Sequence, residues 1–332
     1  SVKATSFIDA LKLPKWDLVY SPVRRVAVAP GQAVTIPNPV NDARTFAGAV
    51  KLAGIAKPQH GTLIAQDGGY VYRADKGYVG EVRIPFQLSN VYGNTCRGTI
   101  RVHVMPDRDN PHLAMGEAAK VSTSGWTKIA FPRRYRRPVV VATIDLKENP
   151  GLVTRVRKVS PTGCEVMLQR IDGGTDAAAC SATWAVLEAG EYSEKRNMLT
   201  ADVGTVDVSP EGMGRQAVGA LRSYEQKAAL LRGVTLGQVQ SFEDSKWTRF
   251  FWRDERGELG IRVGCHYGKD ELPRTNETVG FLRLAHGLYQ FGDTTFRIDS
   301  SGIRTPTLSL RMAYACFNGW GFRSVERYFA KK

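Results

Sequence analysis

The chain has 332 residues, which is enough for two or three domains with apolar cores. Hydrophobic residues make up 42% of it, and no apolar run approaches the ~20 residues of a transmembrane helix, so we expect no membrane insertion. The formal net charge of +14 predicts acidic neighbours, namely nucleic acid, acidic glycans or acidic protein surfaces, unless the basic surface contacts only solvent. No nucleic-acid-binding motif is present, so we do not expect nucleic acid as a partner.

Residues 1–22 are predicted to form an extended N-terminal arm. Pro14 and Pro22 oppose a helix, while Trp16 and Tyr20 offer large side chains that can anchor the arm on a neighbouring subunit. No apolar leader follows Ser1. Either a leader was removed or the chain follows an initiator Met directly, and the small Ser1 favours the second explanation.

Residues 23–106 are predicted to form a β-sandwich, because short β-branched and aromatic runs alternate with Gly and Pro turns. The expected strands are 26–28, 33–36, 61–64, 70–72, 82–86 and 98–104. The run Pro58-x-His60-Gly61-Thr62, the pairs Gly69-Tyr70 and Gly77-Tyr78, and the closing 98–104 strand resemble the bacterial and phage Ig-like, cadherin-like modules. That resemblance implies a spacer or docking role.

A polar linker, 107–111, precedes a second predicted sandwich at 113–193. Its β-branched runs lie at 138–144, 153–159 and 181–187, and Pro161-Thr162-Gly163 is a turn signal. Four arginines stand just before the first run and are candidates for assembly contacts or a solvated rim: Arg133, Arg134, Arg136 and Arg137.

This second block resembles the H-type lectin module, a trimer-forming β-sandwich that binds N-acetylgalactosamine. The resemblance is carried by Gly125-Trp126, Phe131, Tyr135, Arg137-Pro138-Val139-Val140, Val159-Ser-Pro-Thr-Gly163 and Ser181-x-x-Trp184. It implies a homotrimer. Gly151, Ile171 and Asp172 stand where the family has its sugar-binding Arg and Trp-His pair, so the known sugar site is not expected in this block.

Residues 199–332 are predicted to form a diverged second copy with a C-terminal extension. Residues 138–144 match 233–239 about 95 positions on, and 184–192 match 281–289 about 97 positions on, with aromatic, Gly and Tyr positions preserved. The complete fold class is therefore all-β: an Ig-like sandwich followed by two H-type-lectin-like antiparallel sandwiches.

The five cysteines form no CxxC motif, so we expect neither a metal site nor a full disulfide framework. Cys164 and Cys180 flank a predicted hairpin with its tip near Gly173-Gly174. A cross-strand disulfide there and two buried thiols are both open.

The second copy carries the candidate carbohydrate site. In the hairpin that holds the family's Trp-His pair, His266 and Tyr267 offer a ring face, and Asp270 and Arg274 offer partners for sugar hydroxyls. An ordinary polar turn is the alternative for this stretch.

No catalytic or cofactor-binding motif is present, so we expect a non-enzymatic protein without a cofactor. The module types and the absence of a leader predict a bacteriophage virion protein, a fibre, spike or decoration of head or tail. Its expected partners are other virion proteins and a cell-surface polysaccharide. A structural protein without sugar affinity and a secreted bacterial adhesin at the cell surface are the alternatives.

Overall fold

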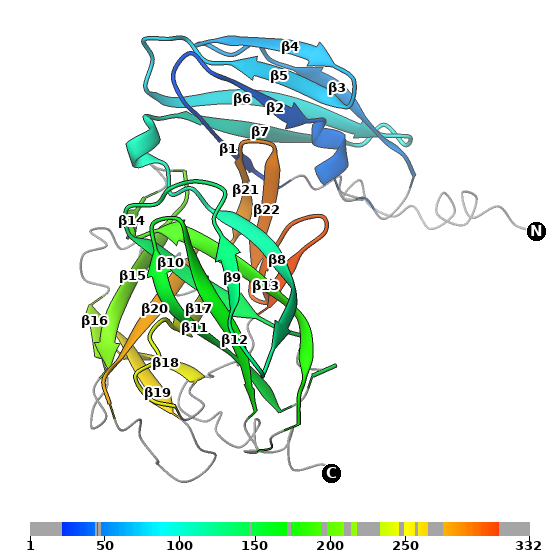
Figure 1. The fold of residues 1–332 in the computed structure, drawn as a ribbon. Coiled ribbons are helices and arrows are strands. Elements are labelled where there is room, and N and C mark those ends of the chain that lie inside the picture. Colours follow the sequence, from blue (N-terminus) through cyan, green and yellow to red (C-terminus); the bar gives the residue numbers. More distant parts are fainter. Residues whose placement is uncertain are drawn as a thin grey trace, which may run out of the picture. The chain divides into compact units, whose positions relative to one another are not determined.

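The computed structural model describes residues 22–43, 45, 48–145, 148–149, 151–170, 174, 176–193, 198–208, 214–217, 233–245, 249–255, 258–264 and 275–311, with only the backbone at 214–217, 249–255 and 258–264. Their regular elements are β-strands and two short 3-10 helices (Figure 1). The predicted all-β class is therefore confirmed. Within these ranges no helix is long and apolar enough to cross a membrane.

The chain divides into two compact units. The first contains Ser1–Asn110, Lys195–Met198 and Gly287–Thr295, and the second contains Pro111–Glu194, Leu199–His286 and Phe296–Lys332. The residues predicted as an Ig-like sandwich lie in the first unit, which also takes in a distant strand. The two predicted lectin-like blocks contribute to one and the same second unit.

The first unit is a sandwich of two sheets, with strand orders β21-β1-β7-β6-β3 and β2-β5-β4. Buried Val, Ile and aromatic residues alternate along the strands and form the core between the sheets. The strands are β1 (Arg24–Val28), β2 (Ala33–Pro37), β3 (Val50–Ile55), β4 (Thr62–Gln66), β5 (Gly69–Arg73), β6 (Gly80–Asn90), β7 (Thr95–Val104) and β21 (Gly287–Phe291), with the 3-10 helices η1 (Pro39–Asp42) and η2 (Asp107–Asp109).

Strand β21 enters the first unit from far along the chain. It pairs with β1 in parallel, from Arg24 opposite Leu288 to Ala27 opposite Phe291. The buried Arg24 side chain donates to Gln290 Oε1 (3.1 Å) and to Thr295 Oγ1 (2.9 Å), and it forms an ion pair with Asp42 (2.8 Å). Neither β3 nor this long-range pairing was among the sequence expectations.

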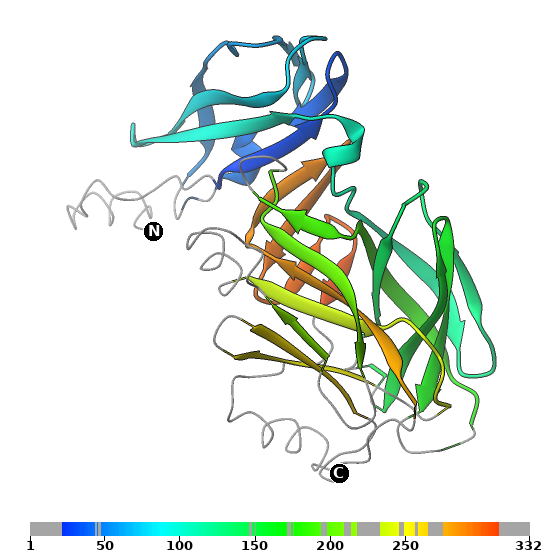
Figure 2. The ribbon, with the colours of Figure 1, turned by 90° about the vertical axis from the view of Figure 1, so that its left-hand side faces the viewer.

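Among the described residues, four antiparallel sheets lie wholly in the second unit, with orders β10-β13-β8, β11-β12-β9, β14-β15-β20-β17 and β16-β19-β18. The strands can be followed by colour in Figures 1 and 2. They are β8 (Ala114–Ser122), β9 (Thr127–Ala130), β10 (Pro138–Thr143), β11 (Leu152–Ser160), β12 (Gly163–Arg170), β13 (Ala179–Glu188), β14 (Gly190–Tyr192), β15 (Ala201–Val208), β16 (Gly214–Ala217), β17 (Val234–Val239), β18 (Arg249–Glu255), β19 (Glu258–Gly264) and β20 (Glu277–Leu284); β22 (Thr294–Asp299), β23 (Gly302–Arg304) and β24 (Ser309–Arg311) follow, and β22 belongs to this unit from Phe296 onward.

The first two of these sheets share strand topology with the last two. The order β10-β13-β8 corresponds to β17-β20-β15, and β11-β12-β9 corresponds to β18-β19-β16. The registers agree as well: Gly116 lies opposite Trp184 in one sheet, and Gly204 lies opposite Phe281 in the other. We call residues 113–193 the first sandwich and 199–284 the second sandwich.

The glycine opposite each aromatic ring has a packing role. A Cβ on Gly116 would lie 2.3 Å from the Trp184 ring, and one on Gly204 would lie 3.0 Å from the Phe281 ring. Gly116→Ala is therefore expected to lower the free energy of unfolding by about 1–3 kcal/mol, the usual cost of overpacking, and Gly204→Ala by less. Chemical denaturation of both variants checks this order, and equal losses would contradict it.

The turn at Pro161-Thr162 is confirmed, because it joins β11 to β12 with Ser160 opposite Gly163. The predicted hairpin between Cys164 and Cys180 is wrong. Cys164 lies in β12 and Cys180 in β13, and these strands belong to different sheets. Both thiols are free. Burial raises the pKa of Cys164 to about 12 because the apolar core disfavours a thiolate.

Candidate functional site

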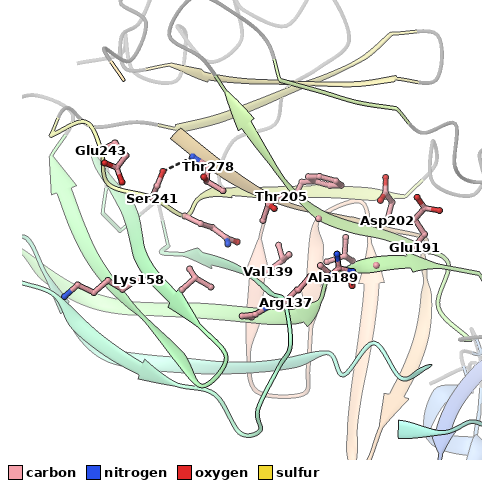
Figure 3. Close-up of a pocket in the computed structure, with 17 residues that line it drawn as sticks. Arg137, Val139, Lys158, Ala189, Glu191, Asp202, Thr205, Ser241, Glu243 and Thr278 are labelled. Carbon is pink, nitrogen blue, oxygen red and sulfur yellow. Dashed lines mark hydrogen bonds between the residues drawn. The ribbon is translucent and has the colours of Figure 1, made fainter. Parts of the chain in front are cut away.

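A cleft of about 840 Å³ lies in the second unit (Figure 3). One side comes from the first sandwich, including its last strand β14, and the other comes from β15, β20 and the loop after β17. Its lining residues are Arg137, Pro138, Val139, Lys158, Val159, Ala189, Gly190, Glu191, Asp202, Val203, Gly204, Thr205, Gln240, Ser241, Glu243, Thr278 and Phe281.

The arginine segment forms one edge of the cleft through its backbone. The buried Glu188 carboxylate accepts hydrogen bonds from the Arg136 N–H (2.8 Å) and the Arg137 N–H (2.6 Å). The Tyr192 hydroxyl donates to the Glu188 carbonyl (2.8 Å). Glu188 therefore holds the segment that carries Arg137, whose side chain is exposed beside the cleft.

The opposite wall is the loop 240–245, which the buried Glu277 carboxylate holds. Oε1 of Glu277 accepts from the Asp244 N–H (3.1 Å), and Oε2 accepts from the Ser241 hydroxyl and the Glu243 N–H (3.4 Å). The Ser241 oxygen in turn accepts from the Thr278 N–H (2.8 Å), a contact drawn in Figure 3. Hydrogen bonds to one carboxylate thus determine the loop's path.

Arg155 of the first sandwich completes this network. Its side chain is fully buried and lies 3.4 Å from Glu277 Oε1, while its guanidinium also donates to the Asp244 carbonyl (3.2 Å) and to Gln169 Oε1 (2.9 Å). The guanidinium carbon stands 4.5 Å from the centroid of the Phe242 ring. Burial lowers the pKa of Arg155 to about 10, although Glu277 and Asp244 oppose that shift.

Two glutamine side chains connect the sandwiches, and one of them, Gln240, lines the cleft. Gln240 Oε1 accepts from the Val140 N–H (2.8 Å), and Gln238 Oε1 accepts from the Ala142 N–H (3.3 Å). Gln238 also donates to the Thr154 carbonyl (3.1 Å). These amides pair with backbone N–H groups of β10 that have no strand partner on that side, so the edge of that sheet is satisfied by the second sandwich.

Two carboxylates stand at one end of the cleft. Glu191 and Asp202 are direct partners in the β14–β15 ladder, and Figure 3 shows them close together, with Lys158 and Glu243 toward the other end. Glu191 is exposed and Asp202 is 4% exposed. Burial raises the pKa of Asp202 to about 6; the nearby Arg283 lowers it in part, and Glu191 raises it further.

The exposed polar side chains of the cleft include cations, anions and a hydroxyl. Arg137 and Lys158 are cationic, Glu191 and Glu243 are anionic, and Thr205 carries a hydroxyl, while Val159 and Gly190 give apolar or backbone surface. Donors and acceptors spread over a partly apolar surface suit a ligand with several hydroxyl groups. Within the described ranges, no group of three or more His, Cys, Asp or Glu residues is placed to hold a metal ion.

The structure places some of the predicted site residues, and the others lie outside the described residues. Arg133 contacts His112 Nδ1 (2.6 Å), Arg134 and Arg136 are exposed, and Arg137 lines the cleft. The anchoring candidates Trp16 and Tyr20, and the carbohydrate candidates His266, Tyr267, Asp270 and Arg274, lie outside the described residues. Sequence reasoning missed Asp202 and Glu277. The only local signal for Glu277 is its place at the start of the apolar run Val279-Gly-Phe-Leu282.

The chain matches no model of a known protein family and no curated protein sequence.

Proposed function

We propose that the chain is a non-enzymatic structural protein of a bacteriophage virion, a fibre, spike or decoration, which binds a host-surface carbohydrate in the cleft of the second unit. Support for the lectin-like part of the proposal comes from the first sandwich. The residues that resemble the H-type lectin module lie in or beside two three-stranded antiparallel sheets that share one core, and Phe131, Tyr135 and Trp184 pack in that core.

The observation that carries the structural role is that buried polar side chains form hydrogen bonds and an ion pair between the two sandwiches. Arg155, Glu277, Gln238 and Gln240 connect one sandwich to the other. Burying charged side chains costs free energy of desolvation, and one reason for a protein to retain them is that they specify a single arrangement of the parts they join. Their placement across the junction favours a chain whose task is to hold two sandwiches as one rigid body, as virion assembly requires.

The cleft supports the carbohydrate-binding part. Its walls are set by Glu188 and Glu277 before any ligand arrives, so ligand binding would not need to order them. Glu191 and Glu243 are exposed acceptors on opposite sides of that rigid frame.

The test is retention on bacterial surface polysaccharides. Glu191→Gln with Glu243→Gln should weaken retention at least about tenfold, since each hydrogen bond to a charged group is worth about 1.5–3 kcal/mol. Glu117→Gln with Asp176→Asn makes the same charge change at exposed positions outside the cleft and should leave retention unchanged. If His266→Ala with Tyr267→Ala abolishes retention while the cleft variant keeps it, the carbohydrate site belongs to the 265–274 segment instead.

Two further measurements test the oligomeric state and the virion assignment. Light scattering should give the mass of a trimer, as the lectin resemblance implies. Gold-labelled antibodies against the chain should decorate released phage particles; labelling of uninfected bacterial cells alone would support a secreted adhesin and overturn the virion assignment.

A further inference from the structure

Arginines line up across three strands of the larger sheet in the first unit. Val26, Ile84 and Val102 face the core, so their neighbours in sequence face outward. On that outer face the registers place Arg25 of β1 opposite Arg101 of β7, and Arg101 opposite Arg83 of β6. Neighbouring strands are about 4.8 Å apart, so three guanidinium groups share one row.

Such a row is unfavourable by itself, because like charges directly opposite one another destabilise a sheet. Glu81 offsets part of this cost: it accepts from Arg83 Nε (2.5 Å) and from Arg101 Nε (3.0 Å). Burial alone would raise the pKa of Glu81, but the hydrogen bonds from Arg101 and Arg83 outweigh it and hold the pKa below its usual value. Arg25 lies over the Tyr289 ring, 5.5 Å from its centroid. One carboxylate therefore pairs with two of the three arginines in the row.

Further basic side chains lie on the same face, toward the other end of β6 and β7. Arg97 of β7 lies opposite Gln87 of β6. Ser89 of β6 lies between Lys51 of β3 and Thr95 of β7. Arg83, Arg97, Lys51 and Thr95 are exposed, and the Arg83 side chain is 71% exposed. We call this set the basic face: Arg25, Lys51, Arg83, Arg97 and Arg101, with Gln87, Thr95 and Thr99 among them.

We propose that the basic face binds an acidic polysaccharide, a polymer that carries carboxylates and hydroxyls together. Guanidinium groups bind carboxylates in bidentate geometry. The interspersed Gln and Thr side chains pair with sugar hydroxyls. This site lies in a different unit from the cleft and does not depend on it.

Nucleic acid fits the face less well. Sequence-neutral binding of single strands relies on aromatic platforms interleaved with the charges, whereas here small hydroxyl and amide side chains stand between the arginines. Duplex DNA is most often read by an inserted helix or β-ribbon, and the basic residues here lie on the face of a five-strand sheet.

The experiment measures binding of the complete chain to polygalacturonate, with neutral dextran and duplex DNA as comparisons. The basic-face variant combines Lys51→Gln, Arg83→Gln and Arg97→Gln, which leaves the Arg101–Glu81 pair intact. The matched control combines Lys120→Gln, Lys128→Gln and Arg134→Gln, three exposed cations of the second unit. The two variants lose the same net charge.

We expect the parent chain to bind polygalacturonate at about 0.15 M salt and more weakly as salt rises. The basic-face variant should bind at least about tenfold less tightly, while the control keeps parental affinity. Equal losses in the basic-face variant and the control would reduce the effect to net charge and overturn the proposal. So would tighter binding to duplex DNA, or no binding to polygalacturonate. If the triple variant unfolds, Arg83→Gln alone should still weaken binding.

Discussion

Glu277→Ala is expected to lower the free energy of unfolding by about 3–5 kcal/mol, because it leaves the buried Arg155 guanidinium without its carboxylate. The substitution also removes the acceptor for the N–H groups of Glu243 and Asp244 and for the Ser241 hydroxyl. The loop 240–245 would lose its anchors together with the ion pair. Denaturant unfolding, followed by fluorescence or circular dichroism, measures the loss.

A second variant separates the charge from the packing. Arg155→Met with Glu277→Leu replaces the ion pair by apolar side chains, which in other proteins is often neutral or stabilising. We expect it to recover a large part of the stability lost in Glu277→Ala but not the hydrogen bonds of the loop. If the double variant is less stable than the single one, the cost does not come from an uncompensated buried charge.

Replacing Asp202 by asparagine is expected to change how stability depends on pH. The pKa of Asp202 is raised in the folded state, so the folded chain holds this proton more tightly than the unfolded chain does. The resulting stability is fully present below about pH 4 and is lost as pH rises through about 6. A shift of about two pKa units corresponds to about 3 kcal/mol. Relative to the parent, Asp202→Asn should gain about that much between pH 4 and pH 7.

The first sandwich provides a control for this experiment. Asp202 lies opposite Arg283, and the same register position in the first sandwich holds Ala114 opposite Val186. The fold therefore accommodates an apolar pair there. Asp202→Ala with Arg283→Val should fold, with equal or greater stability at pH 7 and without the pH dependence attributed to Asp202. If the parental pH dependence persists in this variant, another group causes it.

Local signals identified the strands that carry β-branched or aromatic runs. β-branched and aromatic runs between turn residues predicted β6, β7, β10 and β13, and Pro161 marked the turn after β11. The repeated spacing of 138–144 and 233–239 corresponds to β10 and β17, which hold equivalent positions in their sheets. Hydrophobic patterns depend on which side chains are buried, and turn residues depend on local backbone angles. Both can therefore be recognised in a short stretch of sequence.

The sequence by itself therefore determined the all-β class, the strands with β-branched or aromatic runs and the repeat, whereas the tertiary structure decided which strands pair and which charges are buried. Arg24 meets Gln290 across 266 positions, and β12 and β13 are consecutive yet belong to different sheets. Asp202, Arg155 and Glu277 look like surface residues in sequence because charged side chains usually are. Their burial depends on partners that only the packing of distant strands brings within hydrogen-bond distance, and no local pattern encodes that packing.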